Sequence, residues 1–353
     1  MKNIIFDCER MKYEHSGLFH FCYQLGSHLN HNIDKNRESI TYFSPDSSAE
    51  IWQNHPLIRQ NSLQKLWMPS LGDYDIWHST YQSSNYLPRR NKKIKVVLTI
   101  HDMNFLHEEK KPYKVRKHLR HLQDNIDRSD AIICISEFCK KDVLDHCYVG
   151  DKPVYMIHNG NNHLSPPQLE SRSYHPRKPF LFSLGAICRK KNFHVLVPLL
   201  KFNRHLELII AGTTQDRSYL DYIWSLARRL RVDDNLRLVG GINESEKSWY
   251  YRNCYAFAFP SIAEGFGLPV AEAMSVGKPV FLSDRTSLPE IGSNAAFYFS
   301  NFSEDHMQNV FETGMQEYTS RRMENVIRER GNSFCWHKAA KQYIEVYRSL
   351  SEM

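Results

Sequence analysis

The chain of 353 residues is predicted to be an α/β protein built from two doubly wound, parallel-sheet domains. Three observations predict this fold class. Short apolar runs typical of buried strands alternate with longer runs typical of helices, and this alternation implies parallel strands joined by helical crossovers. A turn-rich stretch at 159–178 interrupts the alternation, which then resumes. The length also suits two domains of ordinary size.

The first domain is predicted to span 1–165, together with a tail at 335–353. Its strands are expected at 3–7, 39–43, 76–80, 95–100, 131–136 and 154–158, and its helices at 17–30, 112–128 and 137–147. Ser136 followed by Glu137 is a suitable start for the last of these helices, because serine caps a helix and an early acid complements its dipole.

The domain linker is placed at 159–178, because its asparagine–glycine turn and its prolines cannot continue a helix or a central strand. The second domain then spans 176–334. Its strands are expected at 179–185, 206–211, 236–240, 255–259, 279–283 and 295–299, and its helices near 192–201, 217–231, 244–252, 268–276 and 304–319. The apolar spacing at 335–350 predicts an amphipathic tail helix.

Composition favours a folded protein of the cytoplasm. Apolar residues make up 41% and charged residues 24%, and no apolar run reaches the length of a membrane span. The apolar run at the N-terminus is short and is interrupted by Asp7, which predicts a strand and not a signal peptide. The eight cysteines are scattered without the paired spacing of a zinc site, so reduced thiols are expected.

The net charge of +7 is concentrated in one segment. Residues 89–120 contain eleven Lys or Arg against three acids, a balance of +8. Two interpretations stay open: a solvated helix face, or a surface that faces anionic lipid head groups or a pyrophosphate-linked acceptor at the inner face of a membrane. Nucleic acid is not expected as a partner, because no nucleic-acid-binding motif accompanies the charge.

The most informative stretch runs from Ser261 to Met274. The apolar run 255–259 predicts a strand, a glycine-containing loop follows, and a helix is expected to start near Leu268 with Pro269 in its first turn. A helix N-terminus presents unpaired N–H groups and the positive end of its dipole to a phosphate. Glu264 in the loop and Glu272 in the helix add two carboxylates, which are good acceptors for sugar hydroxyls.

Two tandem Rossmann-like domains and this E-x7-E stretch resemble the GT-B glycosyltransferases of family 4, a large group of retaining, nucleotide-sugar-dependent enzymes. The resemblance covers most of the chain and is strongest over 180–300. The matching segments are Thr99-Ile100-His101-Asp102, Ile135-Ser136-Glu137-Phe138, Leu184-Gly185-Ala186 with Arg189-Lys190-Lys191-Asn192, Pro260-Ser261 with Glu264 to Pro269 and Glu272-Ala273-Met274, and Leu288-Pro289-Glu290.

The resemblance implies roles for residues of the second domain. Lys191, with Arg189 or Lys190 beside it, resembles the lysine that neutralises the donor diphosphate. The N–H groups of Gly265, Phe266, Gly267 and Leu268 would hold the distal phosphate and orient the transferred sugar. Glu264 resembles the glutamate that contacts this sugar, and Glu272 resembles the glutamate that accepts the ribose hydroxyls.

In the first domain, the resemblance implies roles for two residues. His101 resembles a histidine that faces the sugar and the acceptor, and Gly17 resembles the glycine loop that lets the backbone approach them. Two departures are visible. Many relatives have arginine where this chain has Ala186, and two or three glycines where this chain has Gly17. No function is assigned to 159–162, where many relatives read N-G-V-D.

The resemblance therefore implies a retaining, metal-independent transfer of a hexose from a nucleotide diphosphate to a hydroxyl of a growing, lipid-linked glycan, without a cofactor. GDP-mannose is the favoured donor, and UDP- and dTDP-linked sugars are the alternatives. Attack from the face of the departing diphosphate fits these residues better than a covalent sugar–enzyme intermediate.

Other functions fit the sequence less well. A Rossmann dehydrogenase would need G-x-G-x-x-G after the first strand, which is absent, and a pyridoxal-phosphate phosphorylase of this fold would be far longer. The string Asp73-Tyr74-Asp75 could chelate a metal in glycosyltransferases of another fold, but here it is interpreted as a turn before a strand. A catalytically inactive carbohydrate- or nucleotide-binding protein on the same scaffold remains the alternative.

Overall fold

The computed structural model describes the whole chain except residues 15, 69–70, 163, 165, 167–172 and 351–353. The chain forms two compact units, Met1–Gly160 with Cys335–Met353, and Asn161–Phe334. Part of the stretch predicted as a linker, 159–178, lies outside the described residues. Each unit is built around one parallel sheet, as the fold class predicted from the sequence requires.

The first unit holds a sheet of seven parallel strands in the order β3-β2-β1-β4-β5-β6-β7. The strands are β1 (Lys2–Asp7), β2 (Glu38–Ser44), β3 (Leu57–Arg59), β4 (Ile76–Ser79), β5 (Lys95–Ile100), β6 (Ala131–Cys134) and β7 (Val154–Met156). Only β3 is missing from the predicted set. It has three residues, lies at the sheet edge and keeps its side chains partly exposed, so its apolar pattern is too short to detect.

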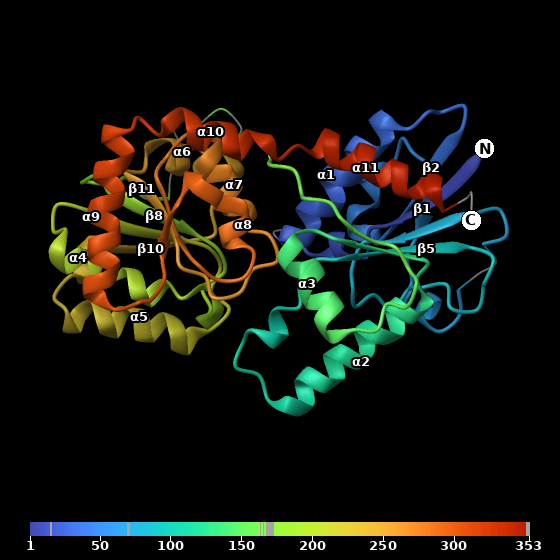
Figure 1. The fold of residues 1–353 in the computed structure, drawn as a ribbon, viewed down its shortest axis with the longest axis horizontal. Helices are drawn as coiled ribbons and strands as arrows, with labels where there is room; N and C mark the ends of the chain where they lie inside the picture. The colour runs from blue at the N-terminus through green and yellow to red at the C-terminus, as the bar shows by residue number, and fades with distance from the viewer. Residues whose placement is uncertain (15, 69–70, 163, 165, 167–172, 351–353) are drawn as a thin grey trace. The chain divides into compact units, whose positions relative to one another are not determined.

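Helices cover both faces of this sheet (Figure 1). The α-helices of the unit are α1 (Gly17–Asn32), α2 (Pro112–Arg128), α3 (Glu137–His146) and α11 (Trp336–Ser349), and its 3₁₀ turns are η1 (Glu9–Lys12), η2 (Asp46–Trp52), η3 (Ser62–Lys65) and η4 (Asn104–Leu106). Ser136 caps α3 by accepting a hydrogen bond from the Cys139 amide at 3.1 Å, as its sequence position predicts.

The tail helix α11 belongs to the first unit and packs against α1. Its Tyr347 hydroxyl lies 2.7 Å from Nδ1 of the buried His78, and burial lowers the pKa of His78 to about 3, so this ring is neutral. Two nitrogens of Arg348 donate to the Glu38 carboxylate at 2.5 and 3.0 Å. The return of the C-terminal helix to the first domain is therefore confirmed.

The second unit holds six parallel strands in the order β10-β9-β8-β11-β12-β13. They are β8 (Phe180–Leu184), β9 (Glu207–Ala211), β10 (Leu236–Gly240), β11 (Ala256–Phe259), β12 (Val280–Ser283) and β13 (Phe297–Phe299). All six were predicted. Along β11, Ala256 and Ala258 face one helical layer while Phe257 makes an edge-to-face contact with Tyr251 of the other. Strands covered on both faces read as continuous apolar runs, which made them visible in the sequence.

The helices of the second unit form these two layers (Figure 1). Its α-helices are α4 (Leu199–Phe202), α5 (Arg217–Arg229), α6 (Glu244–Asn253), α7 (Leu268–Ser275), α8 (Leu288–Gly292), α9 (Glu304–Ser320) and α10 (Glu324–Ser333), and its 3₁₀ turns are η5 (Arg189–Lys191), η6 (Phe193–Leu196), η7 (Asp233–Asn235) and η8 (Ser293–Ala295). Residues of α4, α5 and α9 share one apolar cluster with the sheet, and α7 packs on α10.

One helix prediction in this unit was wrong. The helix expected at 192–201 is broken into η6 and the four-residue α4. Asn192 has a positive φ of 58°, and Pro198 lacks the amide that a continuous helix needs in its interior. The helix α10 was not predicted, because its sequence ENVIRERGNS has few apolar residues.

The strand order places the carboxyl ends of β8 and β11 side by side. Both sheets reverse their strand order next to the first strand of the unit, between β1 and β4 and between β8 and β11. Open α/β sheets bind ligands outside the carboxyl ends of their strands at such a reversal. In the second unit, the loops at this position are 185–191 and 260–267. Among the described residues, no helix combines the length and apolar character needed to cross a membrane.

Candidate active site

The predicted phosphate loop follows β11 and leads into α7. Gly267 is the N-cap of α7 with a φ of 102°, a conformation that glycine adopts without strain. The first hydrogen bond of the turn runs from the Val270 amide to the Gly267 carbonyl at 2.9 Å. The amides of Gly267 and Leu268 come before this first hydrogen bond in the chain, where a helix leaves its amides without intrahelical partners. Pro269 has no amide hydrogen. A helix start with this geometry is suited to an anion.

Hydroxyl groups from the end of β12 and from the segment after it bind the backbone of the predicted phosphate loop. The Glu264 amide donates to Oγ1 of Thr286 at 2.9 Å. Ser287 Oγ donates to the carbonyls of Glu264 and Phe266 at 3.0 and 3.1 Å, and Ser283 Oγ donates to the Ser261 carbonyl. These partners lie about 20 residues away in sequence, and the sequence analysis did not identify them.

Lys191 and Glu264 form an ion pair at the centre of the candidate site. The Lys191 Nζ lies 2.5 Å from Oε1 of Glu264, and the side chains are only 14% and 12% exposed. Ser261 Oγ donates to the same carboxylate oxygen at 2.5 Å. Burial alone would raise the pKa of Glu264, but the charges of Lys191 and Lys190 outweigh it, so the pKa is lowered. Glu264 is therefore an ionised carboxylate in a buried setting.

The Lys191 side chain lies between Gly185, which leaves room for it, and the aromatic ring of Phe259. A Cβ on Gly185, the residue after β8, would lie 3.1 Å from Cε of Lys191. On the other side, Nζ lies 4.7 Å from the centre of the Phe259 ring at the end of β11. Both contacts come from neighbouring strand ends, and together they direct the ammonium group toward Glu264.

The two basic neighbours of Lys191 have different surroundings: Arg189 is directed to Asp216, and Lys190 acts on Glu264 through its charge. Arg189 Nε lies 3.6 Å from Asp216, the N-cap residue of α5, and its side chain is 67% exposed. The charge of Lys190 helps to lower the pKa of Glu264, and its carbonyl accepts the Ile262 amide at 3.0 Å. The structure therefore pairs Lys191 with Glu264 and Arg189 with Asp216.

Glu272 lies in α7 but is bound by partners of its own. Only 3% of the residue is exposed. Its carboxylate accepts hydrogen bonds from Lys247, Tyr251 and Asn162 at 3.0, 3.1 and 3.0 Å. The sequence analysis missed all three of these residues and assigned no function to the segment that contains Asn162.

His101 and Gly17 lie in the first unit. His101 follows β5, and its Nε2 donates to the Thr80 carbonyl at 2.7 Å. Burial is the main cause that lowers the pKa of His101 to about 4, so the ring is neutral with Nδ1 as its acceptor. Gly17 begins α1, and a Cβ there would meet no atom within 4 Å, so the backbone does not require glycine at this position.

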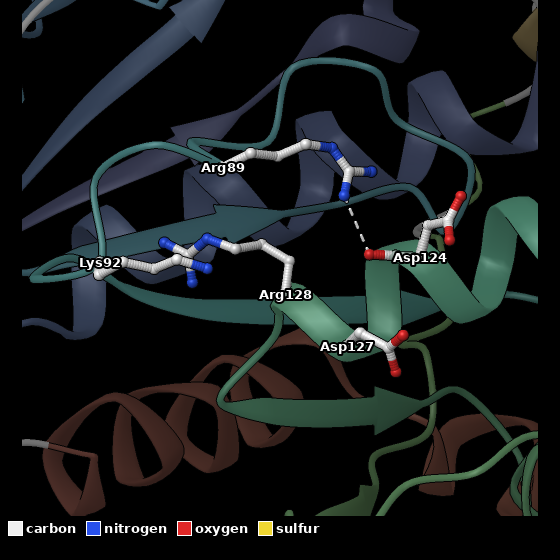
Figure 2. Close-up of a pocket in the computed structure, with 5 residues that line it drawn as sticks. All are labelled: Arg89, Lys92, Asp124, Asp127 and Arg128. Carbon is white, nitrogen blue, oxygen red and sulfur yellow. Dashed lines mark hydrogen bonds between the residues drawn. The ribbon is translucent and has the colours of Figure 1, made fainter.

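The basic segment 89–120 divides into two parts with different surroundings. In the loop, Arg89 donates to the carbonyl of Asp124, and Arg128 of α2 donates back to the carbonyls of Pro88 and Asn91. Figure 2 shows these arginines among the residues that line a hollow: Arg89, Lys92, Asp124, Asp127 and Arg128. The volume of the hollow is about 280 Å³. These bonds hold the loop on the end of α2. In the first half of α2, the basic side chains are exposed: Lys114, Arg116, Lys117 and Arg120.

The string Asp73-Tyr74-Asp75 is a turn before β4, as predicted. The Asp75 carboxylate accepts the Asn3 amide at 2.8 Å, and the Asp73 carbonyl accepts the Asn3 side chain at 2.7 Å. The turn lies at the amino end of the strands, which is the edge opposite to the ligand-binding edge of such sheets. Its carboxylate thus serves to join two strand starts. Within the described part of the chain, no group of three His, Cys, Asp or Glu is arranged to hold a metal ion.

Comparison with known proteins agrees with this geometry. Residues 24–163 match the family model "Glycosyltransferase Family 4", and residues 168–330 match "Glycosyl transferases group 1". The chain is 26% identical over 293 residues to the O-antigen chain mannosyltransferase B of Escherichia coli, covering 75% of this chain and 72% of that protein.

Two further relatives bear on the family and the fold. A GDP-mannose:cellobiosyl-diphosphopolyprenol alpha-mannosyltransferase of Komagataeibacter xylinus is 25% identical over 180 residues, covering 50% of this chain and 43% of that protein. The structure of a sucrose-phosphate synthase from Thermosynechococcus elongatus covers 100% of both chains with a TM-score of 0.78 at 18% identity. The chain therefore belongs to the group 1, family 4 glycosyltransferases and has the GT-B fold.

Proposed function

We propose that this glycosyltransferase transfers mannose from GDP-mannose to a hydroxyl group of a growing, lipid-linked glycan, with retention of the anomeric configuration. The observation that carries the proposal is the buried Lys191–Glu264 pair beside the N-terminus of α7. A fixed cation and a helix start meet there at the carboxyl ends of β8 and β11. A nucleotide diphosphate needs this combination when it leaves the sugar.

In the proposed complex, the diphosphate enters between Lys191 and the amides of Gly267 and Leu268. The Lys191 ammonium then exchanges part of its contact with Glu264 for a phosphate oxygen. Glu264, released from part of this contact, accepts hydrogen bonds from hydroxyl groups of the transferred sugar. Lys190 adds a second positive charge nearby, which fits its effect on the pKa of Glu264.

The chemical step that we propose breaks the bond between the anomeric carbon and the phosphate oxygen. The acceptor hydroxyl attacks on the same face, and its proton passes to the departing phosphate oxygen, so configuration is retained. Lysine and the helix N-terminus take up the charge on the leaving group, and no divalent cation is required for this. His101 is proposed to accept a hydrogen bond from sugar or acceptor through Nδ1, because its Nε2 is occupied by Thr80.

Support for mannose comes from the relatives, whose names state mannosyl transfer and, in one case, GDP-mannose as donor. The same two names, O-antigen chain and diphosphopolyprenol, support a growing, lipid-linked glycan as the acceptor. The nucleotide, the sugar and the acceptor can be tested separately.

We expect GDP-mannose to raise the melting temperature of the protein more than UDP- or dTDP-linked sugars do. A ligand at 100 times its Kd stabilises the folded state by about 2.7 kcal/mol. Differential scanning fluorimetry with each donor measures this, and ¹H NMR of the product determines the anomeric configuration. A larger shift with UDP-linked sugars would reject GDP-mannose, an inverted product would reject retention, and the lack of any donor-dependent shift would reject the proposed transfer from these nucleotide sugars.

We further propose that the first half of α2 binds anionic lipid head groups. Its exposed basic residues stand on a helix whose first turn holds no acid. Cations at a helix N-terminus oppose the helix dipole, so their presence there is unfavourable for the isolated helix. Attraction to an anionic surface offsets this, at about 1 kcal/mol for each basic residue near the membrane.

Charge reversal on α2 is expected to weaken binding to vesicles of phosphatidylglycerol. The paired substitutions Lys114→Glu and Lys117→Glu should lower the bound fraction in vesicle sedimentation, and added salt should lower it for the unaltered protein. The matched control is Lys338→Glu with Lys341→Glu on α11, which is expected to leave binding unchanged. Equal losses for both pairs, or no binding by the unaltered protein, would reject a specific role of α2.

A further inference from the structure

A buried polar cluster surrounds the Glu272 carboxylate in the second unit. The Lys247 Nζ lies 3.0 Å from Oε1 of Glu272 and 2.8 Å from Oε2 of Glu244. The Lys247 side chain is 9% exposed and that of Glu272 is 4% exposed, whereas Glu244 is 53% exposed at the start of α6. Tyr251 and Asn162 complete the cluster by donating to Oε2 and Oε1 of Glu272. The cluster thus connects α6, α7 and the beginning of the unit.

The hydrogen bonds of Glu272 leave little of its capacity unused. A carboxylate has about four acceptor positions. Among the described residues, Oε1 takes two donors, Lys247 and Asn162, and Oε2 takes one, Tyr251. One position on Oε2 therefore remains for a ligand. With three of its acceptor positions filled, the carboxylate can accept one further hydrogen bond from a hydroxyl group, and only from one direction.

Lys247 supplies the positive charge that faces this buried carboxylate. A buried carboxylate without a partner is strongly unfavourable and takes up a proton instead. Burial would lower the pKa of Lys247, but Glu272 and Glu244 outweigh this and raise it, so the lysine is charged. Burial, together with the charge of Glu272, raises the pKa of Tyr251 well above its usual value, so its hydroxyl stays a donor.

We propose that Lys247 is a positioning residue that holds the Glu272 carboxylate aimed at a single hydroxyl group of the donor's ribose, the 2′-hydroxyl. The proposal rests on the proposed function, in which Glu272 contacts the ribose of the nucleotide. It adds a substrate class to that function. Because the cluster offers one aimed acceptor, the protein selects ribonucleoside over 2′-deoxyribonucleoside diphosphates, which disfavours dTDP-linked donors.

The discrimination follows from what each nucleotide leaves unpaired. With a ribonucleotide, the fourth acceptor position of Glu272 gains a hydroxyl donor. With a 2′-deoxynucleotide, the hydroxyl at this place is lost and the carboxylate stays short of one partner, which a buried charge tolerates poorly. If Lys247 is removed, Glu272 loses its buried counter-charge, one hydrogen bond and its fixed direction. The preference for the ribonucleotide should then decrease.

Calorimetric titration of the full chain with GDP, UDP and their 2′-deoxy forms tests this. For the unaltered protein we expect at least one ribonucleotide to bind about tenfold more tightly than its deoxy form. Lys247→Met should weaken binding of that ribonucleotide about tenfold and bring the ratio close to one. Lys247→Arg should restore most of the ratio. Lys201→Met is the control, because Lys201 also pairs with a glutamate, Glu304, but lies on α4 in the other helical layer.

The ratio and its rescue by Lys247→Arg separate positioning from a merely structural effect, because a loss of folding would weaken binding of the ribonucleotide and of its deoxy form alike. If Lys247→Met does not fold, Tyr251→Phe removes one donor without a change of charge and should lower the ratio about threefold. An unchanged ratio in the folded variants would overturn the proposal. Failure of the unaltered protein to bind any nucleotide would overturn the proposed function as well.

Discussion

Replacing Lys191 by methionine is expected to lower kcat about 100- to 1,000-fold. The ammonium group is the buried cation that faces Glu264, and the proposed reaction places a diphosphate charge beside it. Methionine keeps an unbranched stem between Gly185 and Phe259, so the fold should be retained. Steady-state kinetics with the identified donor gives kcat and KM, and the melting temperature reports on folding.

Arg189→Ala is the matched control for this substitution. The two residues are separated by one position and carry the same charge, but Arg189 is directed to Asp216. Its loss should change kcat less than about tenfold, because a largely exposed ion pair contributes little. Removal of Lys191 should also raise the pKa of Glu264, because burial, which raises it, is then opposed by Lys190 and the Ser261 hydrogen bond but no longer by Lys191. Equal losses for Arg189→Ala and Lys191→Met would show that Lys191 has no special position in the site.

The sequence predicted the two sheets well because both are covered on two faces. A strand between two helical layers needs apolar side chains at every position, and such runs are detectable without knowledge of the fold. The exceptions have local causes. The strand β3 is short and half-exposed, and α10 has a mostly polar sequence. The break at Asn192 and Pro198 depends on backbone angles that an apolar spacing does not reveal.

The candidate site was predicted only as far as its components are consecutive in sequence. The loop and helix start from 264 to 272 form one continuous motif, so their proximity is given by the chain itself. Which of three adjacent basic side chains pairs with Glu264 depends on the turn η5, and in the structure it is Lys191. The partners of Glu272 come from α6 and from Asn162, 110 positions away, and no local pattern connects them.

Among glycine-to-alanine substitutions in the second unit, Gly212→Ala is expected to cause the largest loss of stability. Gly212 follows β9 with a φ of 144°, which residues with a side chain rarely adopt. A Cβ there would lie 1.9 Å from the Gly185 carbonyl oxygen, a distance that no rotamer can relieve because both groups are backbone. Backbone strain and overpacking together should lower the free energy of unfolding by roughly 3–5 kcal/mol.

The same displacement should reach the candidate active site. To make room, Gly185 must move, and the Lys191 stem occupies the space beside Gly185 that a Cβ would fill. We therefore expect Gly212→Ala to lower both the melting temperature, measured by calorimetry, and the affinity for the donor. Gly241→Ala is the control, because its Cβ would make only an ordinary contact, 3.6 Å from Thr213. If Gly212→Ala unfolds at the temperature of the unaltered protein, the close approach of Gly212 and Gly185 does not fix the loop that carries Lys191.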